Sequence, residues 1–198
     1  MTAIADRYRR RADAFEQKVA AVSRDHWANQ SPCRAWNARD VVDHVVDMHA
    51  VMLVGVSPPL TPNSPTVQDD PLGAFRAARA RVESALDDPD VAAVQCRTPT
   101  GHMTVEQQID QVVSDDLVLH GWDLARATGQ DERMDPEDVE RLWRSAQAVP
   151  DDVMGQVPDS GGLRSGRGGV RAISTRTSNS PASRPTAGPH RARSTTVS

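Results

Sequence analysis

Two carboxylates and one imidazole share a face of the helix expected over residues 104–127. Asp116, His120 and Asp123 are spaced four and three positions apart, which on a helix brings their side chains together on neighbouring turns. Such groups are unfavourable to bury unless a cation or hydrogen bonds compensate them. A divalent metal ion would do so, because it neutralises carboxylate charge and accepts neutral imidazole as a ligand. The alternative is a buried Asp–His hydrogen bond that only orders the core.

The apolar pattern of this segment places the three groups on its inward side. On a wheel of about 3.6 residues per turn, Asp116 falls at the centre of the apolar arc, and His120 and Asp123 lie one turn on, to either side of it. The apolar arc contains Val105, Ile109, Val112 and Val113, and the opposite side contains Gln107, Asp110, Gln111 and Ser114. The same acid–His spacing recurs elsewhere in the chain, so the candidate depends on the apolar face rather than on spacing alone.

The elements that must position this site are helical. Apolar residues at three- and four-residue spacing predict four long amphipathic helices, over about residues 3–23, 38–54, 71–87 and 104–127. A Pro-rich loop precedes the third helix, a short fifth helix opens at Asp135 and Pro136, and residues 91–96 could form a short extended piece. With no convincing strands, the chain is predicted to be all-α, an up-down four-helix bundle, which is an architecture that builds metal sites from facing helices.

Residues typical of helix ends support these boundaries. Asn37 and Asp70 are suited to cap the second and third helices, and Thr104 with Gln107 forms a capping box for the fourth. Gly129 is well placed to end that helix.

Composition predicts a cytoplasmic protein that does not bind membranes. The net charge of the 198 residues is −4, no apolar run approaches the length of a membrane span, and the N-terminus lacks a secretory signal. The two cysteines, Cys33 and Cys96, make no disulfide framework. Cys33 lies in a loop between Trp27 and Trp36, and we interpret it as a packing residue rather than a reactive one.

The C-terminal segment differs in kind from the rest of the chain. Residues 159–198 contain seven arginines and one acidic residue among many Ser, Thr, Gly and Pro residues. Subtracting this charge of +6 from the overall −4 leaves about −10 for the remainder. We therefore predict a helical domain over residues 1–150 and a disordered basic tail over residues 151–198. The tail has no aromatic residues on which bases could stack, so nucleic acid is not an expected partner.

Two motifs make the chain resemble a known family. Residues 116–129 read D-L-V-L-H-G-W-D-L-A-R-A-T-G. This run is similar to the signature helix of actinobacterial metal-binding proteins of the DinB-like four-helix-bundle superfamily, which are related to the metal-binding domain of mycothiol-dependent maleylpyruvate isomerase. Residues 31–46 read S-P-C-R-A-W-N-A-R-D-V-V-D-H-V-V, which looks like the second-helix motif of that family. The resemblance covers about residues 1–150 and is stronger for fold and metal binding than for the reaction.

The resemblance implies a metal triad of His44, Asp116 and His120. Asp123 would lie outside the ligand set and either orient an imidazole or fix a contact between helices. Three protein ligands leave one coordination position open, as in reactive rather than purely structural sites. Zn²⁺ is the favoured ion, and Ni²⁺ or Fe²⁺ would also suit these ligands. Periodicity alone would choose His49, which lies well inside the apolar arc of the second helix, whereas His44 lies at its edge. We take His44 as the ligand, with His49 as the alternative.

The resemblance also implies that the metal activates mycothiol or a similar low-molecular-weight thiol for a transfer or isomerisation on a small electrophile. In that mechanism no protein side chain acts as the nucleophile. Two other functions stay open: a non-catalytic metal- or ligand-binding protein, such as a sensor or decayed paralogue, and a plain helical bundle. The sequence is compatible with a homodimer. The basic tail departs from the usual ending of the family, and a frameshift would produce such an end.

Overall fold

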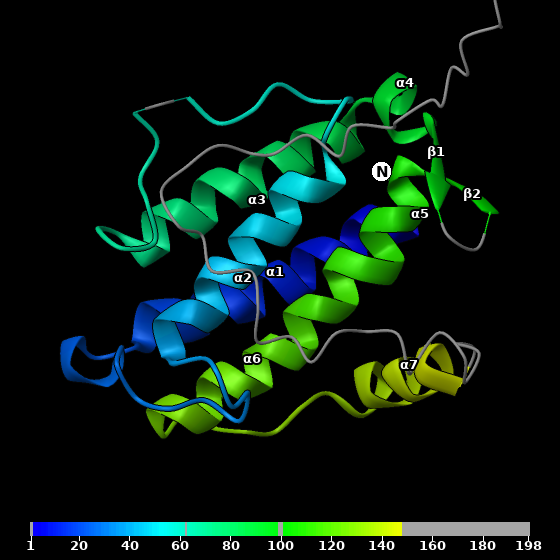
Figure 1. The fold of residues 1–198 in the computed structure, drawn as a ribbon. Coiled ribbons are helices and arrows are strands. Elements are labelled where there is room, and N and C mark those ends of the chain that lie inside the picture. Colours follow the sequence, from blue (N-terminus) through cyan, green and yellow to red (C-terminus); the bar gives the residue numbers. More distant parts are fainter. Residues whose placement is uncertain (1, 62, 99–100, 148–198) are drawn as a thin grey trace, which may run out of the picture. The chain divides into compact units, whose positions relative to one another are not determined.

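Four long helices lie side by side and enclose a common set of apolar side chains (Figure 1). The computed structural model describes residues 2–61, 63–98 and 101–147, so the predicted tail lies outside the described residues. The long helices are α1 (Ala3–Ala21), α2 (Ala38–Met52), α3 (Pro71–Asp87) and α6 (Ser114–Thr128). The helix α5 (Val105–Gln108) continues into α6 through a π-helical turn, η2 (Ile109–Val113). The all-α helical bundle predicted from the sequence is confirmed.

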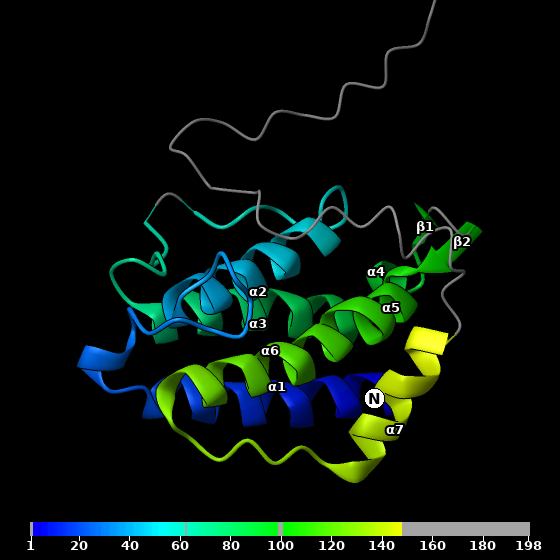
Figure 2. The same ribbon diagram turned by 60° about the horizontal axis from the view of Figure 1, so that its bottom comes forward.

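The up-down order predicted from the sequence does not hold between α2 and α3, because the chain keeps its direction there. Arg39 Nη1, near the start of α2, donates to the carbonyl of Val67 (2.7 Å), a few residues before α3 begins. Accordingly α2 and α3 run in the same direction, and the long connection between them returns along the bundle (Figures 1 and 2). The opposite direction is taken by α1 and by α5–α6, which are joined near their starts by an ion pair of Arg7 with Asp110 (2.8 Å).

The predicted helix ends are present. Asn37, Asp70 and Thr104 each accept a hydrogen bond from a backbone amide in the first turn of the helix that follows. Thr104 and Gln107 form the expected capping box. Gly129 ends α6 with a φ of 71°, a left-handed conformation that glycine adopts without steric strain. Because caps depend on neighbouring residues, the sequence alone located these boundaries.

The expectation that the chain contains no convincing strands was wrong for residues 95–104. The strands β1 (Gln95–Thr98) and β2 (Gly101–Thr104) pair antiparallel, with Cys96 opposite Met103. Of the piece expected to be extended, residues 91–96, the first two residues belong to the helix α4 (Pro89–Ala92) and the last two belong to β1. Each strand has four residues and neither contains a buried one, so the alternation that identifies strands is weak here. The hairpin lies at the end of the bundle where α5 begins (Figure 1).

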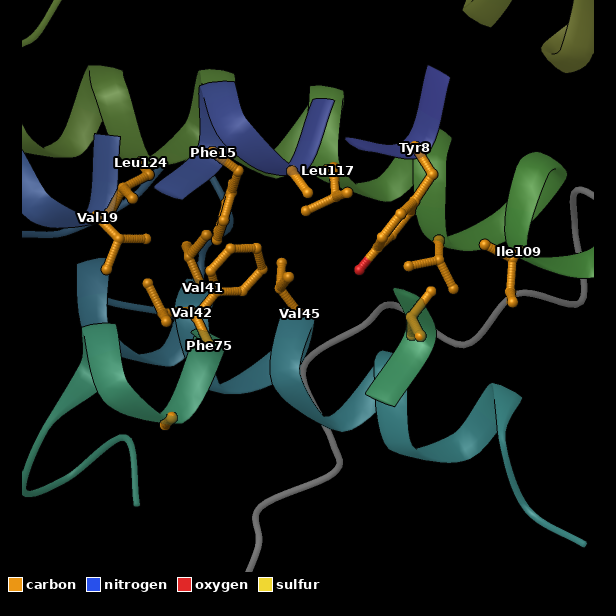
Figure 3. Packing of buried hydrophobic residues seen from close by; sticks show 14 of the residues in the cluster. Tyr8, Phe15, Val19, Val41, Val42, Val45, Phe75, Ile109, Leu117 and Leu124 are labelled. Atoms are coloured by element: carbon orange, nitrogen blue, oxygen red, sulfur yellow. The ribbon is translucent and has the colours of Figure 1, made fainter. Parts of the chain in front are cut away.

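The core receives side chains from all four long helices (Figure 3). The rings of Phe15 on α1 and Phe75 on α3 lie 4.9 Å apart, centroid to centroid. Other fully buried side chains include Tyr8, Val41, Val45, Ile109 and Leu124. Burying one large apolar side chain contributes about 1.5–3 kcal/mol, which exceeds the contribution of a typical cap. Apolar packing therefore holds α2 and α6 in the positions from which they build the site.

The predicted fifth helix, α7 (Pro136–Gln147), lies outside the four long helices (Figure 2) and contacts them through ion pairs. The guanidinium of Arg11 is almost completely buried and donates to Asp115 on α6 (2.9 Å) and to Asp138 on α7 (2.8 Å). Arg141 of α7 pairs with Asp110 (2.9 Å) and Asp115 (3.2 Å). Across the part of the chain that the structure describes, no helix combines the length and hydropathy needed to cross a bilayer.

Candidate metal centre

The π-helical turn η2 determines which side of α6 faces the core. A π turn contains about one residue more than an α turn, so the residues after it are rotated by roughly 100° relative to an uninterrupted α-helix. Leu117 consequently occupies the core, while the side chain of Asp116 is 16% exposed. The placement of Asp116 at the centre of the apolar face was wrong because the wheel assumed one period along the whole helix.

The opposite face of this helix also differs from the prediction. Asp110 and Ser114 were expected on the polar side but are buried, whereas Val112 was expected in the apolar arc and is 36% exposed. The carboxylate of Asp110 is compensated by ion pairs with Arg7 and Arg141 (2.8 and 2.9 Å). The helical periodicity of residues 104–127 contains no information on α7, whose Arg141 pairs with Asp110 on this face.

His44 on α2 comes together with Asp116 and His120 on α6. The two helices are neighbours in the bundle (Figure 1). His44 Nε2 lies 3.5 Å from Asp116 Oδ2, and His120 Nε2 lies 3.2 Å from Asp116 Oδ1. One possible ligand atom of each residue lies within 4.8 Å of the others. All three side chains are partly exposed, His44 the most at 28%, so the cluster is in contact with solvent.

One oxygen of this cluster lacks a donor. Asp116 Oδ2 is buried and accepts no hydrogen bond from the described residues, because the approach of His44 does not make a well-formed hydrogen bond. An unsatisfied buried oxygen is unfavourable, and in native proteins it often indicates an ion or water. Two imidazole nitrogens and a carboxylate form a donor set that divalent transition metals accept. The residues present therefore fit a metal ion.

The charges of the cluster are coupled. Burial raises the pKa of Asp116, but contacts with His120 and His44 outweigh burial and hold that pKa at about 2. Burial likewise lowers the pKa of His120, whereas Asp116 and Asp123 raise it to about 9. Without a metal, Asp116 and His120 therefore form a carboxylate–imidazolium pair at neutral pH.

Asp123 contacts the opposite edge of the His120 ring. Asp123 Oδ2 accepts a hydrogen bond from His120 Nδ1 (2.9 Å) and a longer one from the thiol of Cys33 (3.7 Å). Burial and the neighbouring Asp123 raise the pKa of that thiol, so it stays protonated. Cys33 belongs to the loop between the short 3₁₀ helix η1 (Arg24–His26) and α2. The interpretation of Cys33 as a packing residue missed this contact, which no local pattern in the sequence indicates.

Trp36, in the same loop, lies beside both imidazoles. Its ring centroid is 4.7 Å from that of His44 and 5.6 Å from that of His120, and the two imidazole rings are 4.7 Å apart. Packing against the indole restricts the rotamers of both histidines. The resemblance placed Trp36 in the same second-helix motif as His44, but it did not predict that the indole contacts both imidazoles.

His49 lies apart from this cluster, in the core of the bundle. Its Nδ1 is 2.7 Å from the carbonyl of Val45, and its Nε2 is 3.0 Å from the hydroxyl of Tyr8. Because a carbonyl only accepts, Nδ1 carries the proton and the Tyr8 hydroxyl donates to Nε2. Complete burial lowers the pKa of His49 to about 4. Both ring nitrogens are thus occupied, and the geometry supports His44 over His49 as the candidate ligand.

Comparison with known proteins shows the family to which the chain belongs. A family model described as "Mycothiol maleylpyruvate isomerase N-terminal domain" matches residues 8–125, more than half of the chain. The chain belongs to this family. Two uncharacterized proteins of Mycobacterium tuberculosis, from strains CDC 1551 / Oshkosh and ATCC 25618 / H37Rv, are each 32% identical to it over 136 residues, which is 68% of this chain and 73% of each relative. No solved structure matches the chain.

The resemblance inferred from the two motifs is therefore confirmed. The part of the chain that matches the mycothiol maleylpyruvate isomerase N-terminal domain contains the cluster of His44, Asp116 and His120. It also contains the three residues that lie beside the cluster, Cys33, Trp36 and Asp123. The helix α7 lies beyond the matched residues.

Proposed function

We propose that this protein binds a divalent metal ion through His44, Asp116 and His120 and catalyses a reaction of a mycothiol-type thiol with a small electrophile. The observation that carries the proposal is the buried Asp116 Oδ2, which lacks a hydrogen-bond donor although two imidazole nitrogens lie close to the same carboxylate. Zn²⁺ is the favoured ion, and Ni²⁺ or Fe²⁺ suit the same ligands. Membership of the family supports a mycothiol-related, metal-binding helical protein. Transfer or isomerisation is the finer part of the proposal.

The side chains of the cluster have separate roles in this function. His44, Asp116 and His120 hold the ion and, as three ligands, leave a coordination position for a thiol. Asp123 accepts the Nδ1 proton of His120, which fixes the tautomer whose Nε2 is free to act as a ligand. A bound divalent cation lowers the pKa of a thiol and thereby supplies a thiolate nucleophile. No protein nucleophile is required.

Metal content tests the first part of the proposal. Protein purified without chelators is analysed for metals, and Zn²⁺ affinity is measured by competition with a chromogenic chelator. We expect about one ion per chain in the wild type and a large loss of affinity in His44→Ala, Asp116→Ala and His120→Ala, because each removes one of three ligands. His49→Gln is the control, since it changes a core histidine and should keep the ion. A wild-type protein that binds none of the three metals would overturn the proposal.

Thiol binding and turnover test the second part. Adding mycothiol to the Co²⁺-substituted protein should produce a thiolate-to-cobalt absorption band in the near ultraviolet, absent in His120→Ala. A panel of small electrophiles that includes maleylpyruvate is then assayed for metal-dependent consumption. The absorption band without any turnover would identify a non-catalytic binding protein and contradict the transferase or isomerase part.

A further inference from the structure

The loop that precedes α2 holds Cys33 beside Asp123. The carbonyl of Cys33 accepts hydrogen bonds from Gln30 Nε2 (2.9 Å) and from the amide of Trp36 (3.0 Å). The amide of Cys33 donates to Ser31 Oγ (3.2 Å). The carbonyl and the amide of Cys33 are thus both hydrogen-bonded within the loop, which holds the residue beside α6.

The thiol belongs to a continuous chain of contacts that reaches the candidate ligand. Asp123 is buried, and its Oδ2 accepts from both Cys33 Sγ and His120 Nδ1. Each donor limits the rotamers of the carboxylate, and together they fix the direction in which Asp123 receives the Nδ1 proton. The opposite nitrogen of the same ring, His120 Nε2, is the atom that contacts Asp116. Cys33 is therefore linked through one carboxylate to a candidate metal ligand.

We propose that Cys33 is a positioning residue of this metal centre, which aligns His120 through the shared carboxylate of Asp123. The inference rests on the proposed function, because it concerns the same ion. It assigns to the loop before α2 a role in metal affinity in addition to its packing.

The same three residues also offer a different arrangement. Cys33, His120 and Asp123 have possible ligand atoms within 4.8 Å of one another, so they could hold a cation themselves. That arrangement needs His120 Nδ1 free of its proton, whereas the hydrogen bond to Asp123 requires the proton to stay there. A neutral imidazole cannot satisfy both. We therefore favour the positioning role, and direct ligation becomes an outcome of the test.

The test compares Cys33→Ala and Cys33→Ser with Cys96→Ala, a control at the other half-buried cysteine, in the hairpin. Affinity for Co²⁺ and the visible d–d spectrum of the Co²⁺ protein are measured, with circular dichroism to confirm folding. We expect Cys33→Ala to weaken affinity by roughly tenfold, as loss of outer hydrogen bonds does at other metal sites, and to shift the d–d bands. Cys33→Ser retains a donor and should restore part of the affinity. Cys96→Ala should match the wild type.

Three results would overturn the inference. If Cys33→Ala has the same Co²⁺ affinity and the same d–d spectrum as the wild type, Cys33 has only a packing role. A thiolate-to-cobalt band in the wild type, without added thiol, that disappears in Cys33→Ala would make Cys33 a ligand. The third result concerns the metal-free protein, in which the Nδ1–H proton resonance of His120 should shift in Cys33→Ala but not in Cys96→Ala. An unchanged resonance in Cys33→Ala would refute the contacts that link Cys33 through Asp123 to His120. Failure of the wild type to bind any metal would instead refute the proposed function.

Discussion

Asp116 and His120 lie one helical turn apart on α6 and meet at 3.2 Å, as carboxylate and imidazolium. In the metal-free protein a proton on His120 therefore supplies part of the positive charge that an ion would bring to the carboxylate. A metal has to displace that proton before His120 Nε2 can act as a ligand. Metal affinity and pH are consequently coupled at this site.

Binding of Zn²⁺ at neutral pH should release about one proton from His120, because its pKa of about 9 keeps it charged in the metal-free protein. Calorimetric titrations in two buffers with different ionisation enthalpies count the protons released. The number should fall as the pH is raised through about 9, where His120 is already neutral. A binding heat that does not depend on the buffer at neutral pH would contradict this prediction.

Burial of His49 should make the metal-free protein less stable in mild acid. Its pKa is about 4 in the folded chain against an ordinary value of 6.5, so between these values the unfolded chain takes up a proton that the folded chain does not. The stability contributed by neutral His49 is complete above pH 6.5 and decreases as the pH falls towards 4. At about pH 4.5 the loss should be roughly 2–3 kcal/mol. The free energy of unfolding is measured with urea at about pH 4.5 and above pH 6.5. Its decrease between these pH values should be smaller in His49→Gln than in the wild type, and an equal decrease would show that His49 does not cause it.

Asp123→Asn should weaken Zn²⁺ binding by roughly 10–100-fold while the fold is retained, because the amide is a poorer acceptor for the Nδ1 proton of His120. Chelator competition measures the change. Asp131→Asn is the matched control, since Asp131 is exposed and pairs with Arg133 away from the cluster. Equal affinity in Asp123→Asn and the wild type would show that the hydrogen bond does not orient the ligand.

Arg11→Met should lower the free energy of unfolding by about 3 kcal/mol, because it leaves the buried carboxylate of Asp115 with fewer donors and detaches Asp138 of α7. Arg76→Met, which removes an exposed pair with Glu16, should cost less than about 1 kcal/mol. Urea unfolding compares the two variants. Neither should change metal content, and similar losses in both would contradict the importance of the buried pair.

Features that depend on neighbouring residues were predictable from the sequence. The caps at Asn37 and Thr104 and the end at Gly129 are local, and so is the apolar spacing that gave the helical bundle. The family motifs selected His44, Asp116 and His120, which the structure brings together, and their role as ligands stays a prediction for the metal analysis.

Features that depend on distant residues or on a local change of period were not predictable. The thiol of Cys33 meets Asp123 across 90 positions of the chain, and no pattern in either segment indicates the other. The π turn has no residue signature of its own, so a single helical period misplaced Asp110, Val112 and Ser114. Burial of Asp110 further depends on α7, which lies well beyond it in the chain.

The π turn between Ile109 and Val113 also bears on how such sites arise and disappear. Deleting one residue of the π turn would keep all three candidate ligands in the sequence. It would nevertheless rotate Asp116 and His120 away from α2 by roughly a quarter of a helical turn. Homologues that retain the aspartate and both histidines can therefore differ in metal chemistry through an insertion or deletion alone. A comparison of metal binding among homologues therefore has to include the number of residues between the capping box and the position of Asp116, as well as the ligands themselves.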